Sequence, residues 1–86
     1  MKKIINGKLY NTETATEICT GFFGNFNCKE VTLYKKENGE YFEHHELNEF
    51  GHREWIEPVD ENEAKRFAEE QMDYDDYVSF FGEVEE

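Results

Sequence analysis

The sequence predicts an α+β fold, in which two to three helices pack on a small antiparallel sheet of about three to four strands. Asn-Gly pairs at 6–7 and 38–39 join short runs rich in β-branched and aromatic residues and suit hairpin turns. Asp60 is an N-cap signal, and an apolar stripe at helical spacing follows it. Fourteen aromatic residues can build a core in a chain poor in aliphatic side chains. The 86 residues fit one domain, placed at 1–82, with an acidic C-terminal tail at 83–86.

The first quarter of the chain predicts a hairpin and then a helix. Residues 4–10 match a hairpin that turns at Asn6-Gly7. The helix would begin at Asn11 or Thr12 and end at Gly21 or Gly24. Thr14 and Glu17 stand at capping-box spacing. The apolar face of this helix would consist of Ala15, Ile18 and Cys19.

Three strands and two helices are expected in the remainder. The strands lie at 31–34, 41–44 and 54–56, and Pro58 either ends the last one or places it at a sheet edge. Asp60 and Glu63 stand at capping-box spacing before an apolar stripe of Ala64, Phe67, Ala68 and Met72. A last helix over about 74–81, ended by Gly82, would turn its apolar residues to the core: Tyr74, Tyr77, Val78 and Phe81.

The net charge of the chain excludes some classes of binding partner. The formal net charge is −12, from 21 acidic and 9 basic residues. A polyanion repels nucleic acid and anionic membranes, so neither is an expected direct partner. No apolar run reaches the roughly 18–20 residues that span a bilayer. Residues 1–7 lack the apolar stretch of a signal peptide, so we expect a cytoplasmic protein.

Residues that could bind a metal or act in catalysis occur without a diagnostic pattern. His44 and His45 are adjacent on an expected strand and would point to opposite faces, so they cannot both join His52 on one ion. Cys19 and Cys28 are expected to be free thiols, and their spacing implies no nucleophilic pair. We therefore expect ordinary surface or loop histidines, with no metal, no cofactor and no catalytic residue.

The last 30 residues hold most of the surplus negative charge. Residues 57–86 contain twelve acids and two bases, whereas residues 1–56 contain nine and seven. On a helix, carboxylates opposite the apolar stripe could stand in for phosphates in a basic groove. A solvated face that keeps the protein soluble explains the same pattern, and Arg66 can pair with nearby acids. The candidates for contact with a partner are Glu63, Glu69, Glu70, Asp73, Asp75 and Asp76.

Phenylalanines concentrate in the segment after the expected first helix. Phe22, Phe23 and Phe26 fall in a loop that contains glycine and asparagine. Exposed, they would anchor a partner. The shortage of aliphatic residues instead favours burial as plugs of the core.

Several blocks of the chain resemble a family of short acidic proteins from prophages and mobile elements. They cover about half of the chain and lie at 4–15 (IINGKLYNTETA), 32–42 (TLYKKENGEYF), 61–70 (ENEAKRFAEE) and 81–86 (FGEVEE). The resemblance implies an anti-CRISPR-like inhibitor, a group in which some members act as DNA mimics. Between Phe42 and Trp55 the chain departs from the glycine-rich loop of that family, so the partner of this loop could differ.

Two functions follow as expectations. The first is a non-catalytic inhibitor in the cytoplasm of a bacterial host, whose acidic surface occupies the nucleic-acid-binding groove of a CRISPR effector complex. The alternative is a small interaction or regulatory module that binds a protein partner through apolar contacts or forms a homodimer.

Overall fold

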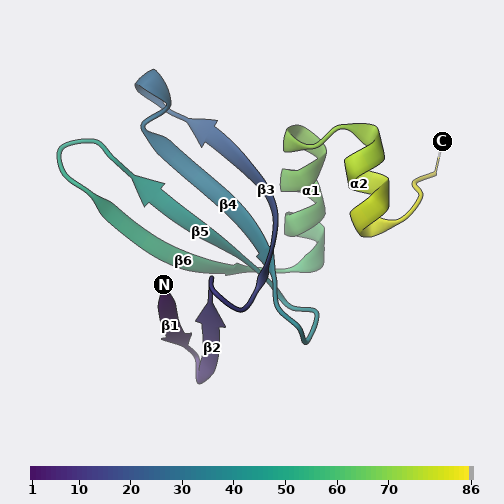
Figure 1. The fold of residues 1–86 in the computed structure, drawn as a ribbon, viewed down its shortest axis with the longest axis horizontal. Coiled ribbons are helices and arrows are strands. Elements are labelled where there is room, and N and C mark those ends of the chain that lie inside the picture. Colours follow the sequence, from purple (N-terminus) through teal and green to yellow (C-terminus); the bar gives the residue numbers. More distant parts are fainter. Residues whose placement is uncertain (86) are drawn as a thin grey trace.

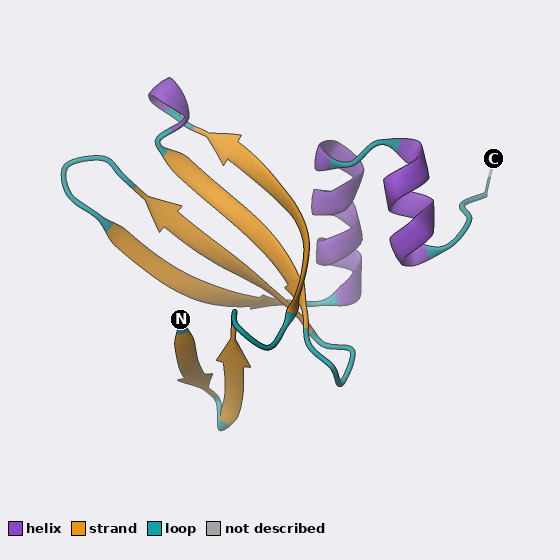
Figure 2. Ribbon diagram, viewed as in Figure 1, coloured by secondary structure: helices purple, strands orange, loops and turns teal. Residues whose placement is uncertain are grey.

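The computed structural model describes residues 1–85 and confirms the α+β fold (Figure 1). An antiparallel meander joins four strands: β3 (Thr16–Phe23), β4 (Lys29–Lys35), β5 (Tyr41–Leu47) and β6 (Arg53–Val59). A separate hairpin pairs β1 (Lys2–Ile5) with β2 (Lys8–Asn11). Two helices follow, α1 (Glu61–Gln71) and α2 (Tyr74–Phe81). Figure 2 shows both helices beside the end of the sheet where β6 finishes, with the β3–β4 and β5–β6 loops reaching away from them.

The predicted hairpin and the three later strands are confirmed. Asn6 and Gly7 both have positive φ, 52° and 76°, as the tight turn between β1 and β2 requires. The predicted strands at 31–34, 41–44 and 54–56 lie within β4, β5 and β6, and each observed strand is longer than predicted. Pro58 lies within β6, which is an edge strand, so its missing amide hydrogen is tolerated there.

The helix predicted after Thr12 is wrong, because residues 16–23 form strand β3. The Asn11 side chain accepts a hydrogen bond from the Glu13 amide at 3.0 Å, which makes a turn where a helix was expected to start. Thr12 accepts a hydrogen bond from the N-terminal amine at 2.8 Å. The segment after the turn is rich in β-branched and aromatic residues, which favour a strand with a full-length neighbour in β4.

Gly21 lies inside β3 and does not end an element. A Cβ atom built on Gly21 would lie 2.8 Å from the Gln71 Cδ and equally close to the Phe23 ring. The glycine therefore allows the end of α1 to approach the sheet.

The main core lies between α1 and one face of the sheet. Asp60 accepts from the Glu63 amide at 2.8 Å and Glu63 reaches back to the Asp60 amide at 3.4 Å, which confirms the predicted capping box. Ala64 and Ala68 are fully buried against Leu33 and Tyr41, with Phe67 and Met72 packed beside them. The predicted apolar stripe is thus the contact face of α1, and its two alanines permit close approach to the strands.

A second core lies under the β1–β2 hairpin on the opposite face of the sheet. Phe42 is fully buried, 5.5 Å from the Tyr10 ring and stacked at 5.1 Å on Tyr34. Lys8 of the hairpin also contacts Glu40, the residue that precedes β5. One aromatic cluster and one ion pair therefore attach the hairpin to the meander.

Helix α2 has the predicted bounds, and Asp73 caps its start by accepting from the Asp76 amide at 2.9 Å. Tyr77 and Phe81 pack against the main core, as predicted. The prediction for Tyr74 is wrong, since its side chain is 66% exposed at the first turn of the helix. Gly82 follows α2, and residues 83–85 carry no regular structure, while Glu86 lies outside the described residues. Among residues 1–85, no helix combines the length and apolarity that a membrane crossing requires.

Candidate functional site

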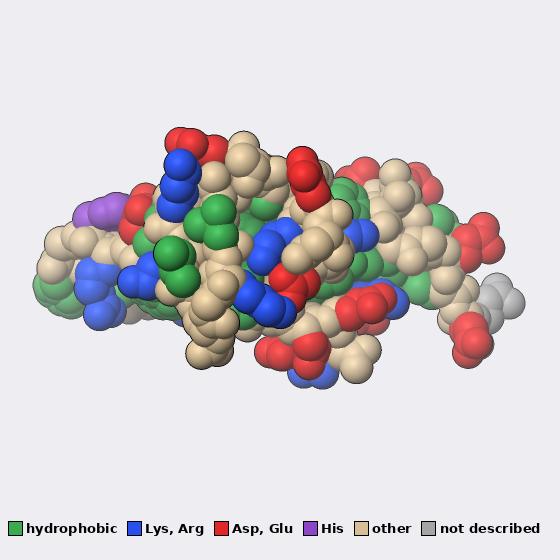
Figure 3. All heavy atoms as spheres, turned by 90° about the horizontal axis from the view of Figure 1, so that it is seen from below, with side chains coloured by type: hydrophobic (Ala, Val, Ile, Leu, Met, Phe, Trp, Pro, Cys, Tyr) green, Lys and Arg blue, Asp and Glu red, His purple; other side chains and the backbone are tan. Residues whose placement is uncertain are grey.

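The six predicted partner-binding acids all lie on the exposed surface of the two helices and their junction. Glu63, Glu69 and Glu70 are on α1, Asp73 lies between the helices, and Asp75 and Asp76 are in the first turn of α2. Figure 3 shows acidic side chains around the end of the molecule that carries the C-terminus. We call the set of six the acidic surface.

Two members of the acidic surface also have structural roles. Glu63 completes the capping box of α1, and Asp73 is the N-cap of α2. Their carboxylates satisfy backbone amides that have no partner within the helix, so their loss would destabilise the fold as well as any interface. Glu69, Glu70, Asp75 and Asp76 form no ion pair within 4 Å among the described residues, and their charges point to solvent.

The two basic residues of α1, Lys65 and Arg66, form few ion pairs with the acids around them. Lys65 bonds Glu61 at 3.1 Å, one turn earlier on α1. Helical spacing allows Arg66 to pair with Glu63 and Glu70, but within residues 1–85 neither carboxylate comes within 4 Å of it. Arg66 is itself exposed beside these acids, so the face of α1 is acidic with one free cation among the described residues.

A shallow hollow of about 360 Å³ lies where α1, α2 and the C-terminal segment meet. Glu69, Asp73 and Glu85 supply its acidic rim, while Tyr74 and Val84, both largely exposed, contribute apolar surface. A partner that binds here would therefore meet both carboxylates and apolar side chains.

The opposite end of the molecule carries exposed phenylalanines, so the interpretation of Phe22 and Phe26 as core plugs is wrong. Phe26 lies in the short 3₁₀ helix η1 (Asn25–Asn27) and is fully exposed, and Phe22 is 58% exposed at the end of β3. Phe50, in the β5–β6 loop, is also fully exposed. A hydrogen bond from the Asn48 amide to the Cys28 carbonyl, 2.9 Å, joins the two loops. We call Phe22, Phe26 and Phe50 the aromatic tip.

The backbone of the aromatic tip is strained. Phe26 and Phe50 have φ values of 57° and 55°, a left-handed conformation that bulky residues rarely adopt. Neither side chain is packed in a core that would compensate for this cost. Phe23 differs from its neighbours, because its ring lies 6.3 Å from Phe67 and is only 36% exposed.

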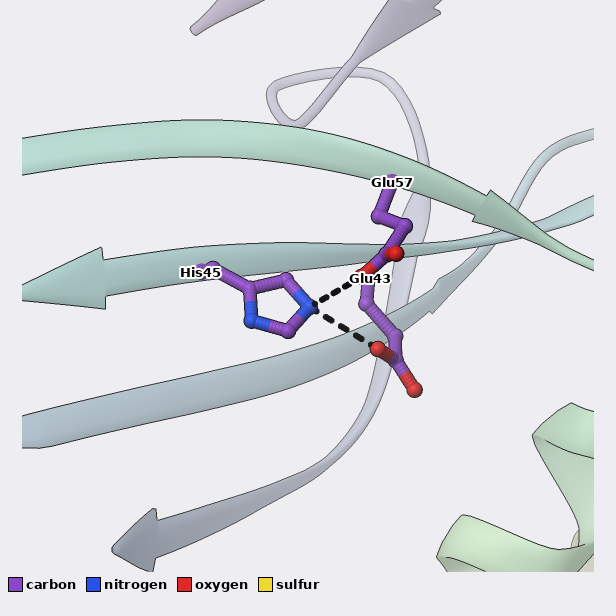
Figure 4. Close-up of side chains that lie close together, drawn as sticks. All are labelled: Glu43, His45 and Glu57. Atoms are coloured by element: carbon purple, nitrogen blue, oxygen red, sulfur yellow. Dashed lines mark hydrogen bonds and ion pairs between the residues drawn. The ribbon is translucent and has the colours of Figure 1, made fainter. Parts of the chain in front are cut away.

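His44 and His45 point to opposite faces of the sheet, as predicted, but His45 is not a surface histidine. It is 7% exposed on the face that carries α1, and its ring stacks on Trp55 at 5.1 Å. Its Nε2 atom lies 2.9 Å from Glu43 Oε1 and 3.1 Å from Glu57 Oε2 (Figure 4). We call Glu43, His45 and Glu57 the β5–β6 triad.

The other face of the same two strands carries a more open group. His52 Nε2 lies 2.7 Å from Glu46 Oε2, and Glu54 is close to both. His44 Nε2 is 3.5 Å from Glu54 Oε2. His52 is half-exposed in the β5–β6 loop, as was expected of it.

Neither cysteine has the properties of a nucleophile. Burial raises the pKa of Cys19 to about 11, and the Glu17 and Glu43 carboxylates act in the same direction. Burial and a hydrogen bond to Glu49 raise the pKa of Cys28. A nucleophilic cysteine requires a lowered pKa, so both are better described as free structural thiols.

Sequence reasoning missed Glu43, Glu57 and Phe50. Glu43 and His45 stand two residues apart on a strand, a spacing that places them on one face and could have been noticed. Glu57 joins them only through the pairing register of β5 with β6, which places it opposite Glu43. Phe50 stands alone in a polar segment and gives no pattern.

Comparisons with known proteins give no relative for this chain. No protein-family model matches it, and no curated protein or solved structure shows significant similarity to it.

Proposed function

We propose that this protein is a non-catalytic inhibitor whose acidic surface occupies a basic nucleic-acid-binding groove of a protein partner, with a CRISPR effector complex as the first candidate. The observation that carries the proposal is the exposure of all six predicted acids at the helical end of the molecule. Inhibition would be steric and electrostatic, because the bound protein excludes DNA from the groove.

Charge distribution supports this choice of surface. Residues 57–86 have ten more acids than bases, whereas residues 1–56 have two more. Duplex DNA carries about one charge per 1.7 Å of its axis, and α1 alone, about 16 Å long, does not reach that density. The acids of α2 and of residues 83–85 add to it at the same end. The proposal therefore requires both helices to contact the partner.

A binding competition tests the proposal. Purified protein is titrated against a panel of guide-loaded CRISPR effector complexes, with and without target DNA, at low and moderate salt. We expect binding that target DNA blocks and that added salt weakens, because both ligands would use the same basic groove. Binding that neither DNA nor salt affects would contradict DNA mimicry.

Matched charge variants locate the surface. The variant E69K/E70K/D75N avoids both capping carboxylates and is expected to abolish inhibition while keeping the thermal unfolding midpoint close to wild type. The control E13K/E17K/E37Q makes the same change in net charge at exposed positions distant from the helices in the chain. Inhibition lost in the first variant and kept in the control assigns the effect to the acidic surface. Equal behaviour of the two variants would reject it.

The aromatic tip favours a second candidate function, a module that binds a protein partner through apolar contacts. Two fully exposed phenylalanines in joined loops are the observation behind it. Such an interface would respond little to salt and would be lost in the double variant F26N/F50N, which leaves the acidic surface unchanged.

A further inference from the structure

We propose that the β5–β6 triad, Glu43, His45 and Glu57, binds one divalent transition-metal ion, with Zn²⁺ as the best match. The inference is independent of the inhibitor proposal and rests on the geometry of three side chains from two adjacent strands.

The three ligand atoms converge at distances close to those of a metal site. Bonds of about 2.0 Å at tetrahedral angles place neighbouring ligand atoms about 3.3 Å apart. In the triad, His45 Nε2 lies 2.9 Å and 3.1 Å from the two carboxylate oxygens, and all three atoms are within 4.8 Å of one another. The two His45 distances are a few tenths of an ångström shorter than this spacing, so the imidazole and each carboxylate would move slightly apart to admit the ion.

The negative charges of Glu43 and Glu57 also favour a cation at this position. Glu43 and Glu57 are direct cross-strand partners, an arrangement in which like charges repel. The Glu43 side chain is only 14% exposed, so water offsets little of that repulsion.

A proton on His45 compensates the negative charge of Glu43 and Glu57 less completely than a divalent metal ion would. A neutral imidazole offers one N–H to two carboxylates. An imidazolium would bring one positive charge to two carboxylates and would still offer them only its single Nε2–H. Its Nδ1–H, like that of a metal-bound imidazole, has no hydrogen-bond partner among the described residues. A dication instead accepts lone pairs from Nε2 and from both carboxylates at once.

The triad is held firmly and remains accessible. His45 is fixed by its stack on Trp55, and all three residues lie on paired strands. Glu57 is 58% exposed on the edge strand, so an ion can enter from that side. Three protein ligands leave a fourth position for water or for a donor atom of another molecule. The imidazole nitrogen selects against Mg²⁺ and Ca²⁺, which prefer oxygen ligands.

Metal titration of the whole chain tests the proposal. EDTA-treated, dialysed protein is titrated with ZnCl₂ by calorimetry and with CoCl₂ while the fluorescence of Trp55, the single tryptophan, is followed. We expect saturable Zn²⁺ binding, quenching by Co²⁺ that EDTA reverses, and no comparable response to MgCl₂. Absence of Zn²⁺ binding by the wild-type chain would overturn the proposal and leave the triad as an ion pair.

Variants on the two faces of the sheet locate the ion. E57Q changes an exposed side chain and is expected to lower Zn²⁺ affinity by at least about ten-fold and to remove the Co²⁺ quenching. H45Q should do the same, and E57Q serves alone if the buried change prevents folding. The matched control H52Q changes a histidine of the group on the opposite face. Co²⁺ should still quench the Trp55 fluorescence of this variant. Quenching that survives E57Q but is lost in H52Q would place the metal on the wrong face for this proposal.

Discussion

His44 and His45 are adjacent in the chain, yet each imidazole lies beside a different glutamate of β6, on opposite faces of the sheet. His44 contacts Glu54 at 3.5 Å and His45 contacts Glu57 at 3.1 Å. The alternation of a regular strand explains this division. One face therefore carries a buried histidine beside two carboxylates, and the other carries a more open group in which His52 is half-exposed.

Glu40 makes the attachment of the β1–β2 hairpin dependent on pH. Hydrogen bonds from Lys8, Asn38 and Lys36 lower the pKa of Glu40 from its ordinary 4.5 to about 2. A carboxyl group with a depressed pKa stabilises the fold above its unfolded pKa, and that contribution is lost as pH falls toward 2. The variant E40Q should therefore unfold at a lower temperature than wild type above pH 4.5, and the gap should close toward pH 2.

Thermal unfolding followed by circular dichroism across this pH range checks the Glu40 prediction. The control is E37Q, which changes an exposed acid three residues earlier that has no ion pair among residues 1–85 and should leave the midpoint nearly unchanged. A difference between E40Q and wild type that is constant from pH 2 to pH 7 would show that the carboxylate charge has no part in it.

The Glu49 carboxylate accepts a hydrogen bond from the Cys28 thiol at 3.5 Å. Burial raises the pKa of Cys28, and the hydrogen bond and charge of Glu49 raise it further. E49Q removes the negative charge, so the pKa of Cys28 should fall and its thiolate fraction at pH 8 should rise. We expect faster modification of Cys28 by a disulfide reagent, with an unchanged rate at Cys19, measured by mass spectrometry of the separated peptides. Equal rates in E49Q and wild type would refute this role for Glu49.

Phe26 costs stability because of its backbone conformation. A left-handed φ of 57° is unfavourable by roughly 1–2 kcal/mol for most L-residues, whereas asparagine tolerates it. Because the Phe26 side chain is fully exposed, F26N should leave the free energy of unfolding unchanged or raise it by up to about 1 kcal/mol. Urea denaturation measures this difference.

The variant F26V provides the control for Phe26. It removes the same exposed ring but places a β-branched residue in the left-handed conformation, so it should destabilise the protein relative to F26N. If F26N is itself clearly destabilised, the ring contributes packing that its exposure does not indicate.

The sequence predicts most of the fold because its strongest signals are local. The turn at Asn6-Gly7, the capping box of Asp60 and Glu63, and the bounds of α2 each depend on a few neighbouring residues, and each is confirmed. The expected first helix failed for the opposite reason. Its capping signals at residues 11–17 were outweighed by pairing of β3 along β4, a long-range contact that no local pattern displays.

The candidate sites also differ in whether a local sequence pattern predicts them. Exposure of the acidic surface could be predicted, because helical periodicity separates Glu69 and Glu70 from the buried Ala68. The β5–β6 triad could not, since Glu57 meets His45 only through the register of two strands. Burial of Phe22 and Phe26 was a wrong prediction because composition alone argued for it, while that end of the sheet offers these two side chains no core to enter.

Pro58 has a consequence for how copies of this chain could associate. An exposed edge strand is a template on which another chain can add a strand, and edge proline and charged residues oppose such addition. β6 carries Pro58 between Glu57 and Val59, with Glu54 further back, so its outer edge is a poor template. The other edge, β3, has no proline and runs for eight residues. Strand addition to this sheet is therefore favoured at β3, where two copies would join edge to edge, and because β6 opposes further addition such an assembly would stop at a pair rather than grow into a fibre.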